Sequence, residues 1–328
     1  MNNQVFNIIN KAASAKSKYN ILTFDTHERY QTQLAKTGHD FYAFRYEGCK
    51  EWDTNFAPKP SNYYTLPKES LFVGLQFDFI LSQSKFGQMQ AAQQIQNILK
   101  VPIVSLEHTL PIDSWPAGQL QAFQQMSGDI NVFISDYSAK IWGIHPHRVI
   151  HHSVDSELFA PNNRTDEYNV LSVVNDFINR DYCCNYSGFQ RITKDLAGVK
   201  VVGDTKGLSE PAESPEALAQ EYNKALCFLN TSTVSPVPTA LLEAMSCGVP
   251  VVSTATCMIP DIIQHGVNGF ISNDETELRG YLEQLRSDAG LREEMGKNAR
   301  TTILNQFSED KFVSEWNTVF SQVYGISR

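Results

Sequence analysis

Residues 232–272 hold the groups whose types and spacing best fit chemistry. The segment STVSPVPTALLEAMSCGVPVVSTATCMIPDIIQHGVNGFIS predicts a loop, a helix, a turn, a strand, a second loop, a short helix and a last strand. The helix should begin near Thr239 and Ala240, and the exposed N–H groups of a helix N-terminus bind phosphate. Glu243 lies one turn further, where its carboxylate can accept hydrogen bonds from a ribose diol. A solvated helix Glu is the alternative, but Glu243 stands in the apolar run ALLEAM, where an uncompensated carboxylate is costly.

Histidines follow two apolar stretches that predict buried strands. His108 comes after residues 102–106 (PIVSL) and Glu107, and His27 comes shortly after residues 20–24 (NILTF). The carboxyl ends of parallel strands share one edge of a sheet, and ligands bind at that edge. Both imidazoles are therefore expected to face a ligand, although a histidine that only caps its strand is an alternative for His108.

A metal site is not expected. His145, His147, His151 and His152 lie close in sequence, but adjacent His151 and His152 would point to opposite sides of a strand. No Cys or carboxylate completes an obvious ligand set around these histidines, and no D-x-D sequence occurs.

The elements that position these residues alternate along the whole chain, which predicts βαβ units and parallel sheets. Strands are expected at 20–24, 39–44, 77–82, 102–106, 130–135, 170–175, 199–203, 226–230, 249–253 and 269–272. Helices are expected at 28–37, 86–99, 214–224, 238–247, 276–287, 290–305 and 309–323. The predicted inner face of helix 86–99 consists of Phe86, Met89, Ile95, Ile98 and Leu99. Residues 45–70, rich in Pro, Tyr and Asn, indicate an irregular excursion.

The length of 328 residues indicates two domains. The change from strand to loop within residues 146–163 predicts an N-terminal domain over 1–153, a second domain over 154–308 and a final segment over 309–328. The fold class is α/β, with two doubly wound, Rossmann-like domains facing across a cleft.

The motifs of the second half resemble the donor-site region of retaining GT-B glycosyltransferases of the family-four type (glycosyl transferases group 1). The resemblance rests on matches in order and spacing: Ser232, Leu241-Leu242-Glu243-Ala244-Met245, Gly248, Pro250-Val251-Val252, Ile259-Pro260-Asp261 and Gly266-Val267-Asn268-Gly269-Phe270. It extends over most of the chain and implies that the final helix crosses back onto the first domain. With about 150 residues, the first domain is short for this family.

The resemblance also implies roles for further residues. His108 matches the position of an active-site histidine next to the donor sugar, and Gly203 matches the glycine that approaches the nucleotide. Arg180 is the best counterpart of a diphosphate-binding cation, ahead of Arg191 and Lys194. Glu243 matches the ribose-binding carboxylate.

Several positions depart from the family pattern. Ser235 stands eight residues before Glu243, where the family has a first Glu that contacts the donor sugar. Pro236 and Pro238 remove two N–H donors from the same loop. Cys257 and Met258 replace a glycine pair at the donor site, and residues 25–28 (DTHE) replace a glycine-rich turn.

The expected activity is transfer of a sugar from a nucleotide-diphosphate-sugar to an acceptor hydroxyl, with retention and without a metal or other cofactor. His108 would orient the sugar, and Ser235 could hydrogen-bond a sugar hydroxyl. The loss of the first Glu keeps a second hypothesis open, in which a catalytically inactive GT-B homologue serves as a binding or scaffold subunit. A nucleotide-sugar epimerase is less favoured, because that chemistry needs carboxylates at the sugar.

The acceptor is expected to be a saccharide or small molecule, with a hydroxylated base in DNA as an alternative. The net charge of −9 disfavours a polyanionic partner, but residues 1–153 hold 13 basic and 12 acidic side chains against 14 and 24 in the rest. The excursion interleaves basic and aromatic residues, a pattern that can bind nucleic acid: Arg45, Tyr46, Lys50, Trp52, Lys59, Tyr63, Tyr64 and Lys68.

The expected location is the cytoplasm. No apolar run is long enough to span a membrane, and residues 1–18 show no secretory signal. The six Cys form no C-x-x-C and suggest no disulfide framework. The sequence does not define an oligomeric state.

Overall fold

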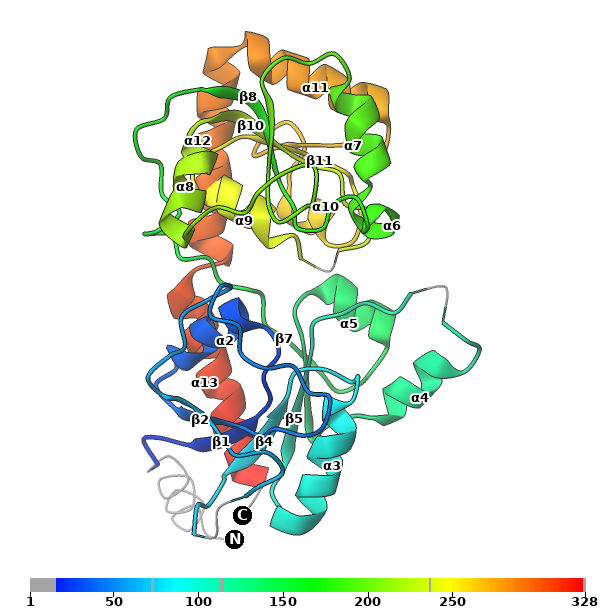
Figure 1. Cartoon of the computed structure of the whole chain (residues 1–328), viewed down its shortest axis with the longest axis vertical. Coiled ribbons are helices and arrows are strands. Elements are labelled where there is room, and N and C mark those ends of the chain that lie inside the picture. The colour runs from blue at the N-terminus through cyan, green and yellow to red at the C-terminus, as the bar shows by residue number, and fades with distance from the viewer. Residues whose placement is uncertain (1–15, 72–73, 113–114, 236, 327–328) are drawn as a thin grey trace, which may run out of the picture. The chain divides into compact units, whose positions relative to one another are not determined.

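The computed structural model describes residues 16–71, 74–112, 115–235 and 237–326. The chain divides into two compact units: unit 1 comprises residues 1–151 and 310–328, and unit 2 comprises residues 152–309 (Figure 1). The predicted absence of a secretory signal concerns residues 1–18, most of which lie outside the described residues. None of the helices in the described ranges is long and apolar enough to cross a membrane.

Unit 1 contains a parallel sheet whose order reverses beside its first strand. The order is β3-β2-β1-β4-β5-β6-β7, so the chain proceeds to one side of β1 and then returns to the other. This reversal creates a topological switch point between β1 and β4, at the carboxyl edge of the sheet. The strands are β1 (Asn20–Thr23), β2 (Asp40–Ala43), β3 (Tyr63–Thr65), β4 (Phe79–Ser82), β5 (Ile103–Glu107), β6 (Ile130–Phe133) and β7 (Arg148–Val149).

The last helix of the chain packs into unit 1. Its apolar residues recur at helical spacing, and Phe312, Trp316 and Phe320 are buried. Trp316 Nε1 donates to the hydroxyl of Tyr30 at 3.0 Å. The helices of this unit are α2 (Glu28–Ala35), α3 (Gln88–Leu99), α4 (Gln119–Gln125), α5 (Asp136–Trp142) and α13 (Glu309–Ile326).

Unit 2 repeats the doubly wound plan with the parallel order β12-β11-β10-β8-β9. Its switch point therefore lies between β8 and β10, because the chain moves from β8 to β9 on one side and then crosses to β10 on the other. The strands are β8 (Tyr168–Val173), β9 (Val199–Val202), β10 (Ala225–Asn230), β11 (Val251–Ser253) and β12 (Phe270–Ile271).

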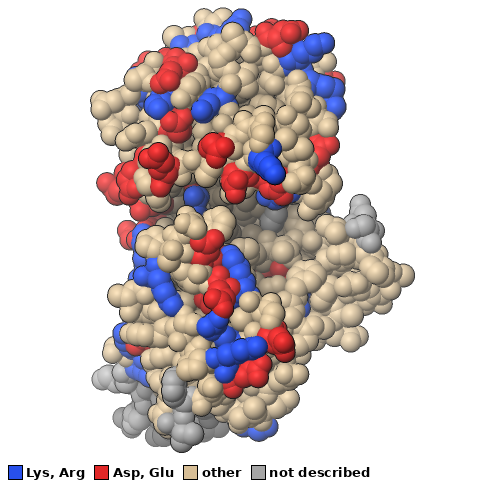
Figure 2. All heavy atoms as spheres, in the orientation of Figure 1, with Lys and Arg blue, Asp and Glu red and all other residues tan. Residues whose placement is uncertain are grey.

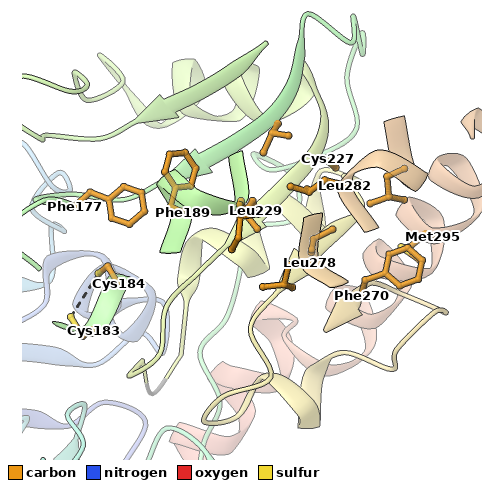
Figure 3. Packing of buried hydrophobic residues seen from close by; sticks show 14 residues of the cluster. Phe177, Cys183, Cys184, Phe189, Cys227, Leu229, Phe270, Leu278, Leu282 and Met295 are labelled. Carbon is orange, nitrogen blue, oxygen red and sulfur yellow. Dashed lines mark hydrogen bonds between the residues drawn. The ribbon is translucent and has the colours of Figure 1, made fainter. Parts of the chain in front are cut away.

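Helices cover both faces of the second sheet. The helices are α6 (Asp181–Cys184), α7 (Tyr186–Thr193), α8 (Pro215–Asn223), α9 (Thr239–Ser246), α10 (Ile259–Ile262), α11 (Glu275–Ser287) and α12 (Ala289–Gln306). Helix α7 packs with α11, whereas α9 packs with α8 and α12. Figure 3 shows the core between the sheet and the first pair, with Phe189 of α7, Leu229 of β10 and Leu282 of α11. On the face shown in Figure 2, the surface of unit 2 carries acidic side chains interspersed with basic ones.

The predicted α/β architecture is confirmed, and some local expectations were wrong. The excursion contains a parallel strand, β3, which pairs with β2. Helices α4, α6 and α7 were not expected. On the predicted inner face of helix 86–99, Phe86 is 44% exposed and Ile98 is 71% exposed, because Phe86 precedes the helix and Ile98 lies on its outer side.

Candidate functional site

The carboxyl edge of unit 2 brings together the loops that follow β8, β10 and β11. The hydroxyl of Thr231 donates to the carbonyl of Cys184 at 2.9 Å, and the N–H of Thr233 donates to that of Cys183 at 2.8 Å. The hydroxyl of Thr256 donates to the carbonyl of Ser232 at 2.9 Å. These bonds hold three loops at the switch point, where open α/β sheets bind ligands.

Glu243 lies on α9 and is buried, with 7% exposure. The hydroxyl of Tyr222, on α8, donates to Glu243 Oε2 at 2.8 Å. Helical side chains point back toward the helix N-terminus, and α9 runs antiparallel to its neighbouring strands, so Glu243 leans toward the carboxyl edge of the sheet. Burial with a hydrogen-bond partner means that Glu243 is not the solvated helix Glu of the alternative interpretation.

The N-terminus of α9 lies at the same edge. Pro238 is its N-cap and makes no side-chain cap, while the N–H of Leu241 bonds to the Pro238 carbonyl at 3.0 Å. The backbone N–H groups of Thr239 and Ala240 have no partner among the described residues. Two oriented N–H donors and the positive end of the helix dipole favour an anion at this point. Pro236 lies outside the described residues.

Gly203 follows β9 and is required by close packing. Its φ is +137°, and a Cβ at this position would lie 2.1 Å from the carbonyl oxygen of Val174, in the loop after β8. No larger residue fits there without separating the ends of β8 and β9, which are neighbours in the sheet. The structure thus gives a packing reason for the glycine, and its contact with a nucleotide stays a prediction.

Cys257 and Met258, the residues at the position of the expected glycine pair, form a turn after β11. Cys257 has a φ of +52°, a left-handed conformation that favours glycine. Met258 is buried and forms the N-cap of α10. The departure in residue type therefore leaves a tight turn in place after β11.

The cations expected near a diphosphate differ in their surroundings. Arg180 is exposed at the start of α6, in the loop after β8. Arg191 instead forms an ion pair with Glu275 at 2.6 Å. Arg180 therefore remains the preferred candidate on the switch-point loop. Ser235, partly exposed, lies in the loop between β10 and α9.

The edge of unit 1 shows what replaces the glycine-rich turn. Asp25 is buried and accepts a hydrogen bond from the hydroxyl of Tyr63 at 2.6 Å. Glu28 accepts from Lys50 Nζ at 2.7 Å and from the N–H of Asp53 at 3.1 Å. Burial raises the pKa of Asp25. The two acidic side chains thus fasten the excursion to the carboxyl end of β1.

His27 and His108 meet at this edge, as their positions after β1 and β5 predict. Their ring centroids lie 4.4 Å apart, and the ring of Tyr30 lies 4.6 Å from that of His108. His27 is exposed, whereas His108 is buried with 7% exposure. Although His27 keeps solvent contact, the protein atoms packed around its ring and the positive charge of Lys50 disfavour its charged form and lower its pKa. The remaining predicted site residues belong to unit 2.

A buried charged pair beside His108 escaped the sequence analysis. Lys85 is 1% exposed, and its Nζ donates to the carbonyl of Met126 at 2.7 Å. Glu107 accepts from the N–H of Lys85 at 3.0 Å and from the hydroxyl of Thr109 at 2.6 Å. Burial lowers the pKa of Lys85 to about 8 and raises the pKa of Glu107. Only the position of Glu107 at a strand end signalled such a role.

Three basic residues of the excursion have partners within the protein. Lys50 binds Glu28, Lys59 lies over the ring of Tyr63 with its Nζ 5.6 Å from the ring centroid, and Arg45 pairs with Glu51. Among the described residues, no three His, Cys, Asp or Glu side chains are placed to share a metal ion. His145 and His147 contact each other, with ring centroids 4.8 Å apart.

Comparison with known proteins assigns part of the chain to a protein family. Residues 211–302 match the family model of glycosyl transferases group 1. These residues form a glycosyl transferases group 1 domain. N-acetyl-alpha-D-glucosaminyl L-malate synthase of Bacillus anthracis is 40% identical over 85 residues, which cover 25% of this chain and 22% of that protein. An uncharacterized glycosyltransferase of Methanocaldococcus jannaschii is 30% identical over 108 residues, which cover 32% of this chain and 27% of that protein.

Solved structures match over nearly the whole chain. HepE of Anabaena, in complex with UDP and glucose, has a TM-score of 0.75 at 15% identity and covers 92% of this chain and 99% of that one. Sucrose-phosphate synthase of Thermosynechococcus elongatus has a TM-score of 0.74 at 13% identity, with coverages of 94% and 100%. These likenesses confirm the predicted GT-B fold.

Proposed function

We propose that the chain is a glycosyltransferase that uses a nucleotide-diphosphate-sugar donor. The observation that supports this most strongly is the buried carboxylate of Glu243. It lies on α9, within the residues that match glycosyl transferases group 1, and Tyr222 of α8 holds it. At one edge of the sheet, the carboxylate can accept hydrogen bonds from a ribose diol, and the N–H groups of the neighbouring helix N-terminus can donate to a diphosphate. HepE, the similar structure, is bound to UDP and glucose, which supports a donor of this class.

In this proposal, the chain's own groups offset the charge of the leaving diphosphate. The N–H groups of Thr239 and Ala240 and the guanidinium of Arg180 would bind the phosphates, so that no metal ion is needed. His108 would hydrogen-bond the donor sugar, and Ser235 would hydrogen-bond a sugar hydroxyl. Gly203, Met258 and His27 would contact the nucleotide-sugar donor. The proposed stereochemical outcome is retention, with the departing phosphate accepting the proton of the acceptor hydroxyl.

The acceptor is proposed to be a saccharide or small molecule. Ion pairs with Glu28 and Glu51 offset the charges of Lys50 and Arg45, which disfavours a DNA acceptor. We place the reaction in the cytoplasm.

The test begins with the donor. The full chain is incubated with UDP-, GDP- and ADP-linked sugars, with and without EDTA, and release of the nucleoside diphosphate is measured. Slow hydrolysis of one donor, unaffected by EDTA and reduced in Glu243→Gln, supports the proposal. Binding of a nucleoside diphosphate without release from any donor would instead favour an inactive binding subunit. Loss of activity with EDTA would refute the metal-free mechanism.

A further inference from the structure

Gln83 connects His108 to two polar side chains deep in unit 1. It is the first residue after β4 and is fully buried. Its Nε2 lies 2.7 Å from Gln31 Oε1 and 3.4 Å from Thr23 Oγ1. Its Oε1 lies 3.4 Å from Nε2 of His108. The side-chain amide thus bridges β1, α2 and the loop after β5.

Thr23 decides which way the amide of Gln83 points. A hydroxyl has one proton to donate, and Thr23 Oγ1 donates it to the carbonyl of Leu81 at 3.0 Å. Towards Gln83, the hydroxyl can therefore only accept, so the NH₂ group of Gln83 must face it. If the amide were reversed, its oxygen would face the Thr23 oxygen with no proton between them.

The two protons of Gln83 Nε2 thus point to Thr23 and Gln31, which leaves Oε1 to accept from His108. We infer that Gln83 is a positioning residue that holds neutral His108 in the tautomer with its proton on Nε2. In that tautomer, Nδ1 carries the lone pair, and the ring acts through Nδ1 as an acceptor. A substrate hydroxyl that meets this nitrogen would donate a hydrogen bond to it and keep its proton.

The contact with Gln83 also bears on the charge of His108. The rings of His27, the N-cap of α2, and Tyr30, within α2, pack against His108. Gln83 places an amide where a carboxylate would stabilise the imidazolium form instead. The acceptor for His108 Nε2 is therefore the neutral amide oxygen of Gln83. A neutral acceptor suits a histidine that orients a sugar without becoming charged.

The buried Nε2 of Gln31 has no partner among the described residues, so reversal of both amides is the competing arrangement. Reversal would make Nε2 of His108 an acceptor and move its proton to Nδ1. The two arrangements predict opposite tautomers, which ¹⁵N NMR of the imidazole distinguishes in the wild-type chain.

The experiment uses the full chain with ¹⁵N-labelled histidine, and the His108 signals are assigned by their loss in His108→Asn. The expected result at neutral pH is a single Nε2–H tautomer; an Nδ1–H tautomer overturns the inference. Gln83→Leu should produce a mixture of tautomers. Gln83→Glu should raise the pKa of His108 by about one to three units, since a carboxylate would then lie within 4 Å. The control is Gln90→Leu, which removes an exposed amide on α3 and should change neither the tautomer nor the pKa of His108.

The relevance of this tautomer to sugar transfer rests on the proposed function, whereas the NMR result does not. If Gln83→Glu folds and transfers sugar, the pH dependence of kcat should shift with the His108 pKa. If His108 shows the Nε2–H tautomer but the protein transfers no sugar, that result contradicts the proposed function alone. Unchanged His108 signals in both Gln83 variants would contradict the positioning role alone.

Discussion

The bond between Tyr222 and Glu243 leads to a prediction about donor binding. Glu243→Gln keeps the shape of the side chain and removes its charge. Hydrogen bonds to a charged group contribute about 1.5–3 kcal/mol. If the carboxylate binds the ribose diol, its neutralisation should therefore raise the Kd for the nucleoside diphosphate about 10- to 150-fold.

Tyr222→Phe isolates the positioning of the carboxylate. Tyr222 is fully buried, and its hydroxyl lies 2.8 Å from Glu243 Oε2. The variant leaves the charge in place and frees its orientation, so we expect a smaller loss of affinity, about 2- to 10-fold, equivalent to about 0.5–1.5 kcal/mol. Because both residues act on one contact, the double variant should bind no more weakly than Glu243→Gln.

The assay is titration calorimetry with the nucleoside diphosphate and with its 2′,3′-dideoxy analogue. The wild type should prefer the ribose form, and Glu243→Gln should lose most of that preference. Circular dichroism and thermal melting verify that each variant is folded. An unchanged ratio of the two affinities in Glu243→Gln would refute the ribose assignment, even if both affinities fell.

Three further predictions concern single groups. Arg180→Ala should weaken binding of the nucleoside diphosphate about tenfold or more but leave binding of the nucleoside unchanged, as calorimetry at low salt can show. Gly203→Ala should destabilise unit 2 by about 2–5 kcal/mol in urea unfolding, because its Cβ would lie 2.1 Å from the Val174 carbonyl oxygen; a loss below about 1 kcal/mol would contradict this. The pKa of Lys85 is about 8 in the folded chain against 10.5 as its ordinary value, so the folded state binds fewer protons between these values. Stability should therefore rise by up to about 3 kcal/mol from pH 8 to 10.5, and subtracting the urea-unfolding profile of Lys85→Met should isolate this gain.

The second half of the fold was predictable because its signals are local. The strands β10, β11 and β12 are short apolar runs, and α9 lies between turn residues that mark both of its ends. Strand β3 was missed because Tyr63–Thr65 pair with β2, some 20 residues earlier, within a stretch rich in Pro and Asn. Local propensity does not contain that pairing.

The sequence predicted which edge of each sheet the candidate site residues occupy, but not which residues hold them there. Strand ends identified His108 and His27, and a helix start identified Thr239. The residue that holds Glu243 is Tyr222, 21 positions earlier on another helix. His108 meets Gln83, 25 positions earlier. Such contacts follow from how helices and strands pack, and no sequence spacing encodes them.

The departures from the family pattern fall into two kinds: some affect only the local backbone structure, and one changes a chemical group at the predicted site. Cys257 adopts a left-handed backbone conformation that favours glycine, and Asp25 and Glu28 use their carboxylates to fasten the excursion. These changes keep a turn in place or exchange one local structure for another. Ser235 instead puts a neutral hydroxyl where the family pattern has a carboxylate, so under the proposed function the chemical group offered to the sugar would itself change. Donor-sugar preference is therefore where this chain should differ most from its relatives, and Ser235→Glu is the variant that should shift it.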